Sequence, residues 1–125
     1  MGNVNKVILV GNLGAAPELK QTPKNRPYCH LRLATSQTFK DATGAKQERT
    51  EWHRITVWGE TAASCARFLD RGRSVYVEGR LEHRKWEDRE GKQRDATDVV
   101  ATRVVFLGGR ERAHDTTQEA AASAA

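Results

Sequence analysis

Two tryptophans and an arginine alternate along residues 50–58, Thr-Glu-Trp-His-Arg-Ile-Thr-Val-Trp. Side chains of a β-strand point alternately to its two faces, so a strand here would place Trp52, Arg54 and Trp58 on one side. Aromatic rings stack on nucleic acid bases while arginine and lysine contact phosphates, and single strands are held in this way by sequence-tolerant binders. The pattern also fits tryptophans that pack in the core or beneath a helix, because buried Trp is common.

Aromatic residues stand beside basic residues at two further places. Phe39 precedes Lys40, and Arg84 and Lys85 precede Trp86. Three or four stacking rings, at about 1–3 kcal/mol per base, would support tight binding once phosphates are neutralised. The surrounding charged segments mix both signs, as solvated loops do, so we predict phosphate contacts only for the three cations beside the rings. The alternative is that both rings anchor loops on the fold and the cations serve solubility.

The sequence gives little support to catalysis. His30, His53, His83 and His114 show no HxH or HExxH spacing, which a metal site would need. Cys29 and His30 would point to opposite faces of a strand, which is unsuitable for a nucleophile and its base. We therefore predict neither an enzyme nor a metal or other cofactor.

Charge and composition favour a polyanionic partner. The 125 residues carry a formal net charge of +5, and residues 1–110 alone hold 20 Lys and Arg against 13 acidic residues. No apolar run is long enough to span a bilayer and no signal peptide is apparent, so we expect a cytoplasmic, nucleoid-associated location. Cys29 and Cys65 are far apart in sequence, and we expect reduced thiols.

Strands are predicted over 4–13, 28–38, 50–58, 74–84 and 96–107, with a short edge strand within 17–22. The first is apolar on both faces, which predicts burial on both sides. Alternation elsewhere points Cys29, Leu31, Leu33, Val75, Val77 and Leu81 inward, and Gly79 suggests a bulge. Residues 39–49 and 85–95 are predicted to be long polar loops.

A single helix is predicted over 59–69, with Thr61 as a possible N-cap. This order predicts an all-β protein with an OB-fold, a five-stranded Greek-key barrel with one short helix between strands 3 and 4. The predicted domain covers residues 1–109. Residues 110–125 have little apolar content to bury, so we expect a disordered tail.

Five segments resemble the bacterial single-stranded DNA-binding protein family (SSB). They are Asn5-Lys-Val-Ile-Leu-Val-Gly-Asn-Leu-Gly14, Leu33-Ala-Thr-Ser36, Thr50-Glu-Trp-His-Arg54, Val75-Tyr-Val-Glu-Gly79 and Arg84-Lys-Trp86. They occur in the family's order between about residues 3 and 109. The resemblance implies an OB-fold homotetramer that wraps single-stranded DNA in replication, recombination and repair.

The resemblance also implies site residues. Stacking aromatics correspond to Phe39, Trp52, Trp58 and Trp86; well-known members have Trp at the first of these positions and Phe at the third. Implied basic contacts are Lys6, Lys40, Arg54, Arg73, Arg84 and Lys85, and implied oligomer-interface positions are His53 and Tyr76. The first strand resembles one that pairs across a dimer.

The sequence departs from the family pattern in two ways. Glu60 and Glu82 stand where relatives can carry a cation, which predicts a thinner positive track. Family members typically end in an acidic tip, Asp-Asp-Ile-Pro-Phe, that recruits replication and repair proteins. This sequence ends at Ala125 without it, so either the chain is truncated or that recruiting function is missing.

Two other functional classes remain as alternatives. An OB-fold assembly protein could use the tryptophan face to dock a protein partner, and Glu60 and Glu82 favour this reading. A nuclease is the third and weakest. Quenching of Trp fluorescence by oligo-dT would distinguish single-stranded DNA binding from protein docking. Degradation of labelled single strands with added metal would instead support the nuclease.

Overall fold

The chain forms a closed β-barrel with one helix, in a computed structural model that describes residues 2–108. Its elements are β1 (Val7–Leu13), β2 (Lys20–Gln21), β3 (Pro27–Lys40), β4 (Lys46–Trp58), α1 (Gly59–Phe68), β5 (Ser74–Glu87) and β6 (Gln93–Leu107). The sheet order is β1-β5-β6-β4-β3-β2, and an additional β1–β3 pairing closes the five long strands into a barrel. The predicted fold and the position of the helix are confirmed. The predicted tail 110–125 lies outside the described residues.

Alternation along the strands builds the core. Leu31, Ile55, Val75, Val104 and Phe106 are each at most 1% exposed, and α1 adds Ala62 and Cys65 to the same cluster. The predicted inward residues of β3 are buried as expected. The strands therefore bury one face inside the barrel, and their other face is left for other contacts.

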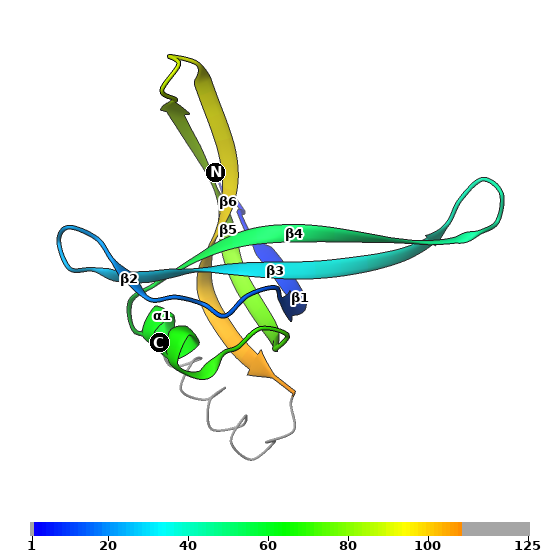
Figure 1. The fold of residues 1–125 in the computed structure, drawn as a ribbon, viewed down its shortest axis with the longest axis horizontal. Coiled ribbons are helices and arrows are strands. Elements are labelled where there is room, and N and C mark those ends of the chain that lie inside the picture. The colour runs from blue at the N-terminus through cyan, green and yellow to red at the C-terminus, as the bar shows by residue number, and fades with distance from the viewer. Residues whose placement is uncertain (1, 109–125) are drawn as a thin grey trace.

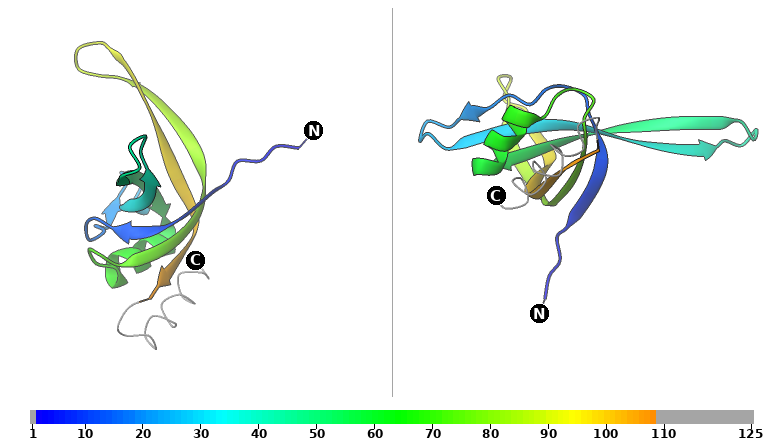
Figure 2. Two further views of the ribbon diagram at one scale, coloured as in Figure 1. Left: turned by 90° about the vertical axis from the view of Figure 1, so that its right-hand side faces the viewer. Right: turned by 90° about the horizontal axis from the view of Figure 1, so that it is seen from below.

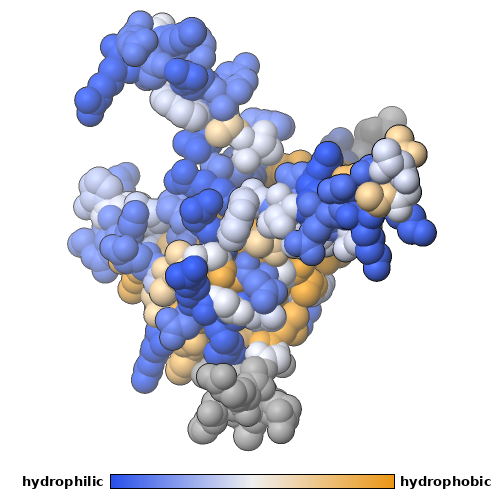
Figure 3. Space-filling model, turned by 45° about the vertical axis from the view of Figure 1, so that its right-hand side comes forward, coloured by the Kyte–Doolittle hydropathy of each residue, from blue (hydrophilic) through white to orange (hydrophobic). Residues whose placement is uncertain are grey.

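Two long hairpins extend beyond the barrel as arms (Figures 1 and 2). The first is formed by the ends of β3 and β4, and the second by the ends of β5 and β6. The prediction of long loops over 39–49 and 85–95 is wrong, because most of these polar residues pair in strands whose two faces are both exposed. Both arms are covered mainly by hydrophilic residues, whereas apolar surface lies on the barrel body (Figure 3).

Close backbone approach requires glycine at two places in the barrel wall. A Cβ on Gly11 would lie 2.1 Å from the Ala34 carbonyl oxygen, and one on Gly79 would lie 2.3 Å from the Val100 carbonyl oxygen. The predicted bulge is confirmed, since the β5–β6 register shifts between Glu78 and Gly79. Leu81, predicted to point inward, is instead 43% exposed because β5 leaves the barrel after this shift.

Strand β1 differs from its predicted burial. Val7 and Leu9 pack against the core, but Ile8 and Val10 are 56% and 53% exposed. The prediction of burial on both faces is wrong for the single chain, because only one face of β1 meets the core. The predicted N-cap at Thr61 is also wrong: Trp58 occupies that position without a side-chain hydrogen bond, and Thr61 is buried.

Candidate nucleic-acid interface

Outward-facing side chains of β3 to β6 line a shallow groove on the barrel wall. One part, of about 260 Å³, is lined by Tyr28, His30, Arg54, Thr56, Trp58, Glu82, Arg84, Asp98 and Val100. An adjoining part, of about 300 Å³, is lined by His30, Arg32, Trp52, His53 and Arg54. We call the two parts together the barrel-face groove. It brings together Trp52, Arg54 and Trp58, which alternation placed on one face, and adds Arg84 from β5.

The aromatic side chains on the groove and arms are open to solvent. Trp52 is 53% exposed, Trp86 42% and Phe39 39%. Trp58 is half-buried, with its ring centroid 5.2 Å from that of Tyr28. The alternative that the tryptophans belong to the core is therefore wrong. Trp52 and Trp58 lie on the barrel wall, whereas Phe39 and Trp86 lie on separate arms.

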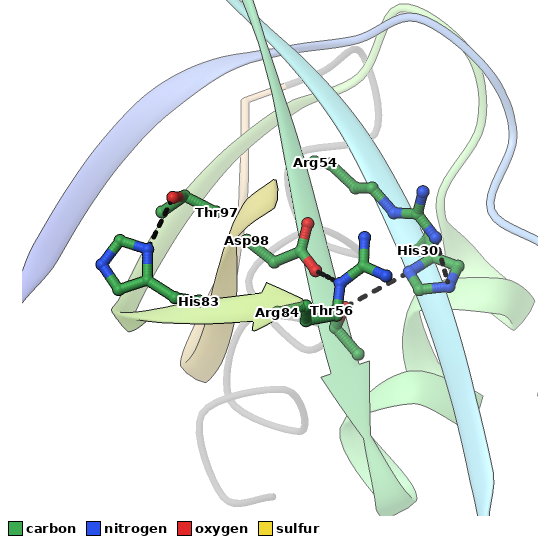
Figure 4. Close-up of polar contacts among 7 residues, drawn as sticks. All are labelled: His30, Arg54, Thr56, His83, Arg84, Thr97 and Asp98. Carbon is green, nitrogen blue, oxygen red and sulfur yellow. Dashed lines mark hydrogen bonds and ion pairs between the residues drawn. The ribbon is translucent and has the colours of Figure 1, made fainter. Parts of the chain in front are cut away.

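A polar network fixes the basic side chains of the groove (Figure 4). Arg54 donates to Nε2 of His30 at 3.3 Å, and Nδ1 of His30 lies 3.3 Å from the Thr56 hydroxyl. Arg84 forms an ion pair with Asp98, a nearly buried carboxylate. The guanidinium of Arg54 keeps its positive charge uncompensated by this network, whereas Asp98 neutralises part of that of Arg84.

The protonation state of His30 follows from its partners. Burial, and then the positive charge of Arg54, lower the pKa of His30 below its ordinary value. His30 is therefore neutral at neutral pH. Because Arg54 can only donate, Nε2 must accept, and the proton on Nδ1 is then directed to Thr56. His30 thus orients Arg54 without adding charge.

Two predicted basic contacts, Lys6 and Arg73, lie outside the groove lining. Lys6 forms an ion pair with Glu78 at 3.4 Å, and Glu78 also accepts from the Tyr76 hydroxyl at 2.7 Å. Arg73 is half-buried just before β5, where its carbonyl accepts from the Leu13 amide. Both positions are on the β1 side of the barrel.

The remaining predicted site residues lie on the arms or, in the case of His53, in the groove lining. Lys40 and Lys85 are exposed on the two arms, opposite Lys46 and Asp95 in the registers. His53 is half-buried, with Nε2 at 2.8 Å from the Thr35 hydroxyl. The arms thus carry positive charge next to Phe39 and Trp86.

The tips of both arms are built in the same way. Asp41 Oδ1 accepts from the Thr43 and Ala45 amides, and Asp88 Oδ1 accepts from the Glu90 and Lys92 amides. The second carboxylate oxygen of each accepts from a side chain six residues later, Gln47 and Arg94 respectively. Gly44 and Gly91 take the positive φ that the turns require. Hydrogen bonds lower the pKa of both carboxyl groups, chiefly the one from the Thr43 hydroxyl at Asp41 and the one from the Lys92 amide at Asp88.

Acid should loosen both tips. Since the folded-state pKa of each carboxyl is lowered, its stabilisation is complete above the ordinary value of about 3.9 and is lost as the pH falls through the folded pKa. We expect constant amide NMR shifts for Thr43 and Lys92 from neutral pH to about pH 5, and changes below about pH 4. In Asp88→Asn only Lys92 should lose this transition, so the Asp41 tip serves as an internal control. Unchanged shifts at both tips in acid would contradict the assignment.

The two thiols are part of the core. Cys29 and Cys65 are both fully buried and unbridged. A hydrogen bond with Cys29, and then burial, raise the pKa of the Cys65 thiol, so it is not an activated nucleophile. Within residues 2–108 no group of three or more His, Cys, Asp or Glu side chains is arranged to hold a metal ion. In the same part of the chain, no helix has both the length and the apolar character that crossing a membrane demands.

Sequence reasoning missed several residues of the site. Tyr28 and His30 line the groove, and the guanidinium groups of Arg26, Arg32 and Arg49 lie over aromatic rings. Alternation already placed His30 and Arg32 on the outward face of their strand. What it lacked was the β3–β4 register, which decides the ring that each arginine meets.

Known proteins share this sequence and architecture. The sequence profile of the "Single-strand binding protein family" matches residues 4–107. Single-stranded DNA-binding protein 1 of Chlorobaculum tepidum is 46% identical over 109 residues, 86% of this chain and 67% of that protein. The single-stranded DNA-binding protein of Neisseria meningitidis serogroup A is 43% identical over 108 residues, 86% of this chain and 62% of that protein. The chain thus spans about two thirds of the length of these relatives.

Two solved structures are similar in fold. A deletion mutant of the single-stranded DNA binding protein from Thermus aquaticus has a TM-score of 0.76 and 34% identity, over 86% of this chain and 52% of that chain. A Plasmodium falciparum SSB in complex with ssDNA has a TM-score of 0.79 and 28% identity, over 86% and 98% of the two chains. The match over nearly all described residues, the closed barrel and the aromatic groove agree: this chain belongs to the single-strand binding protein family.

Proposed function

We propose that this protein binds single-stranded DNA without sequence preference and protects it during replication, recombination and repair. The observation that carries the proposal is the set of solvent-exposed rings, Trp52, Trp86 and Phe39, with guanidinium groups beside them. Bases of an unpaired strand can stack on such rings in any order, because every base has an aromatic face. The family is one of binding proteins and not of enzymes, so no catalytic step or cofactor is invoked.

The proposed contacts follow the residues already described. Phe39, Trp52, Trp58 and Trp86 would stack bases, while Lys40, Arg54, Arg84 and Lys85 would contact phosphates along the groove and arms. Lys6 and Arg73 would meet the strand only where it wraps around the β1 side of the barrel. The proposed location is the cytoplasm, at the nucleoid.

A homotetramer would give the bound DNA strand a longer path over the protein surface. Two observations support an assembled state: Ile8 and Val10 expose apolar side chains side by side on β1, and Tyr76 stands opposite Val10 in the β1–β5 register. Exposed apolar surface of this kind often marks a protein interface. Its place opposite Val10 supports Tyr76 as a subunit contact. His53 is proposed as a subunit contact only because the family resemblance implies it.

Titration with oligo-dT tests the proposed function. We expect quenching of Trp emission, because stacked bases would cover Trp52 and Trp86. The logarithm of affinity should fall with the logarithm of salt by about 0.7 for each phosphate neutralised on a single strand. Duplex DNA should compete weakly, since its bases are already stacked on one another. Absence of quenching together with salt-independent binding would exclude the proposal, and a discrete complex with protein alone would favour the docking alternative.

A further inference from the structure

Each of the four rings proposed to stack bases has an arginine over it. The distances from guanidinium carbon to ring centroid are 4.1 Å for Arg26 and Trp58, 5.1 Å for Arg32 and Trp52, 5.7 Å for Arg49 and Phe39, and 4.9 Å for Arg84 and Trp86. All lie within the range of a cation–π interaction. Of the four arginines only Arg84 stands beside its ring in sequence, so the other three pairings arise from folding.

The strand register produces three of these pairings by one rule. Trp52 pairs with Ala34, and Arg32 lies two residues before Ala34. Trp58 pairs with Tyr28, and Arg26 lies two residues before Tyr28. Phe39 pairs with Gln47, and Arg49 lies two residues beyond Gln47. Residues two apart on a strand share a face, so Arg32 and Arg49 are diagonal cross-strand neighbours of their rings and are long enough to reach them. Arg26 has the same offset but lies just before β3.

The charges of these three arginines are not compensated locally. Arg84 is held by Asp98, but over residues 2–108 none of Arg26, Arg32 and Arg49 forms an ion pair with a carboxylate. All three side chains are exposed. A guanidinium that rests on a ring, without a carboxylate to hold it, can leave that ring for a stronger anionic partner.

The ring beneath Arg32 is fixed in place. A Cβ added to Gly14 would lie 2.4 Å from Cζ3 of Trp52, so the indole rests directly against the Gly14 backbone. The ring is nevertheless 53% exposed. The indole of Trp52 thus packs against the Gly14 backbone, and Arg32 lies over the ring without a carboxylate to hold it.

We propose that Arg26 and Arg32 are DNA-contacting residues that cover Trp58 and Trp52 in the free protein. When a base stacks on the ring, the guanidinium moves to the phosphate of that nucleotide, and Arg49 does the same at Phe39. In this exchange the guanidinium covers only part of each ring before DNA binds, and it adds phosphate contacts beyond those named above. The inference deepens the proposed single-stranded DNA binding and rests on it.

Salt dependence distinguishes this role from simple shielding. The salt slope is the fall in the logarithm of affinity for each unit rise in the logarithm of salt concentration. Arg32→Ala should lower the salt slope of oligo-dT binding by about 0.7, the value for one phosphate on a single strand. Its affinity deficit should therefore grow about eightfold as salt falls from about 1 M to about 0.05 M. Arg32→Lys keeps the charge and should keep the slope. Arg26→Ala should behave like Arg32→Ala.

Arg67 offers a matched control. Its guanidinium lies 5.2 Å from the centroid of Phe68, a similar distance, but Phe68 is on α1 and packs near Phe106. Arg67→Ala removes the same charge and the same type of contact away from the groove. We expect its salt slope to equal that of the unaltered protein.

The outcomes separate the two proposals. Affinity should be measured by anisotropy of labelled oligo-dT, with melting temperatures to verify folding of each variant. If the unaltered protein binds but Arg32→Ala keeps its slope and binds equally or more tightly, the arginine only shields the ring and this inference is overturned. If the unaltered protein fails to bind oligo-dT, the proposed function fails first and the inference falls with it. A slope reduced equally by Arg67→Ala would also overturn it, because the effect would then reflect net charge alone.

Discussion

Removing the indoles of Trp52 and Trp86 together is expected to weaken oligo-dT binding. The expected loss of affinity ranges from about 30-fold to more than about 10⁴-fold. Each base stacked on an aromatic ring contributes about 1–3 kcal/mol, and 1.4 kcal/mol corresponds to tenfold in affinity. The two rings lie on different strand pairs, Trp52 on β4 and Trp86 on the β5–β6 arm, so their contributions should add. Trp52→Ala/Trp86→Ala in a fluorescence-anisotropy titration measures the effect.

Two controls distinguish lost stacking from lost structure. Both side chains are more than two fifths exposed, so the double variant should melt near the temperature of the unaltered protein. Trp52→Phe/Trp86→Phe keeps a ring at each position and should recover most of the affinity. The salt slope should be the same in all three proteins because no charge is removed. Full affinity in the alanine variant would exclude base stacking at these positions.

An aspartate in place of Val10 is expected to dissociate the proposed homotetramer. Ile8 and Val10 are more than half exposed on β1, and an interface formed there would bury the new carboxylate without a partner. An uncompensated buried charge costs several kcal/mol per subunit, enough to disrupt a contact of modest area. Sedimentation should show a tetramer for the unaltered protein and particles near the 14.0 kDa of one chain for Val10→Asp.

The control for this experiment changes an apolar residue of similar exposure elsewhere. Leu19 is 43% exposed just before β2, so Leu19→Asp adds the same charge away from β1. It should leave the tetramer intact. A single 14.0 kDa species for the unaltered protein would contradict the proposed assembly, and a tetramer that survives Val10→Asp would place the interface elsewhere.

Local patterns in the sequence predicted the barrel and the outward face that carries Trp52 and Trp58. Strict alternation over 28–38 identified Cys29, Leu31 and Leu33 as core, and the apolar stripe after Trp58 identified the only helix expected. Such patterns succeed because the side chains of a strand must separate core from solvent every second residue. The types of residue at 52, 54 and 58 likewise indicated stacking and phosphate chemistry before any contact was known.

Tertiary structure alone decided which residues meet across strands. Alternation assigns a side chain to a face but does not select its neighbour, because register depends on turns and on contacts distant in sequence. The sequences of the two polar arms predict loops, because a strand with two solvated faces has no alternation of apolar and polar residues. For the same reason the arginine that covers Trp52 could not be chosen from sequence: Arg32 is 20 positions away and reaches the ring only through the β3–β4 register.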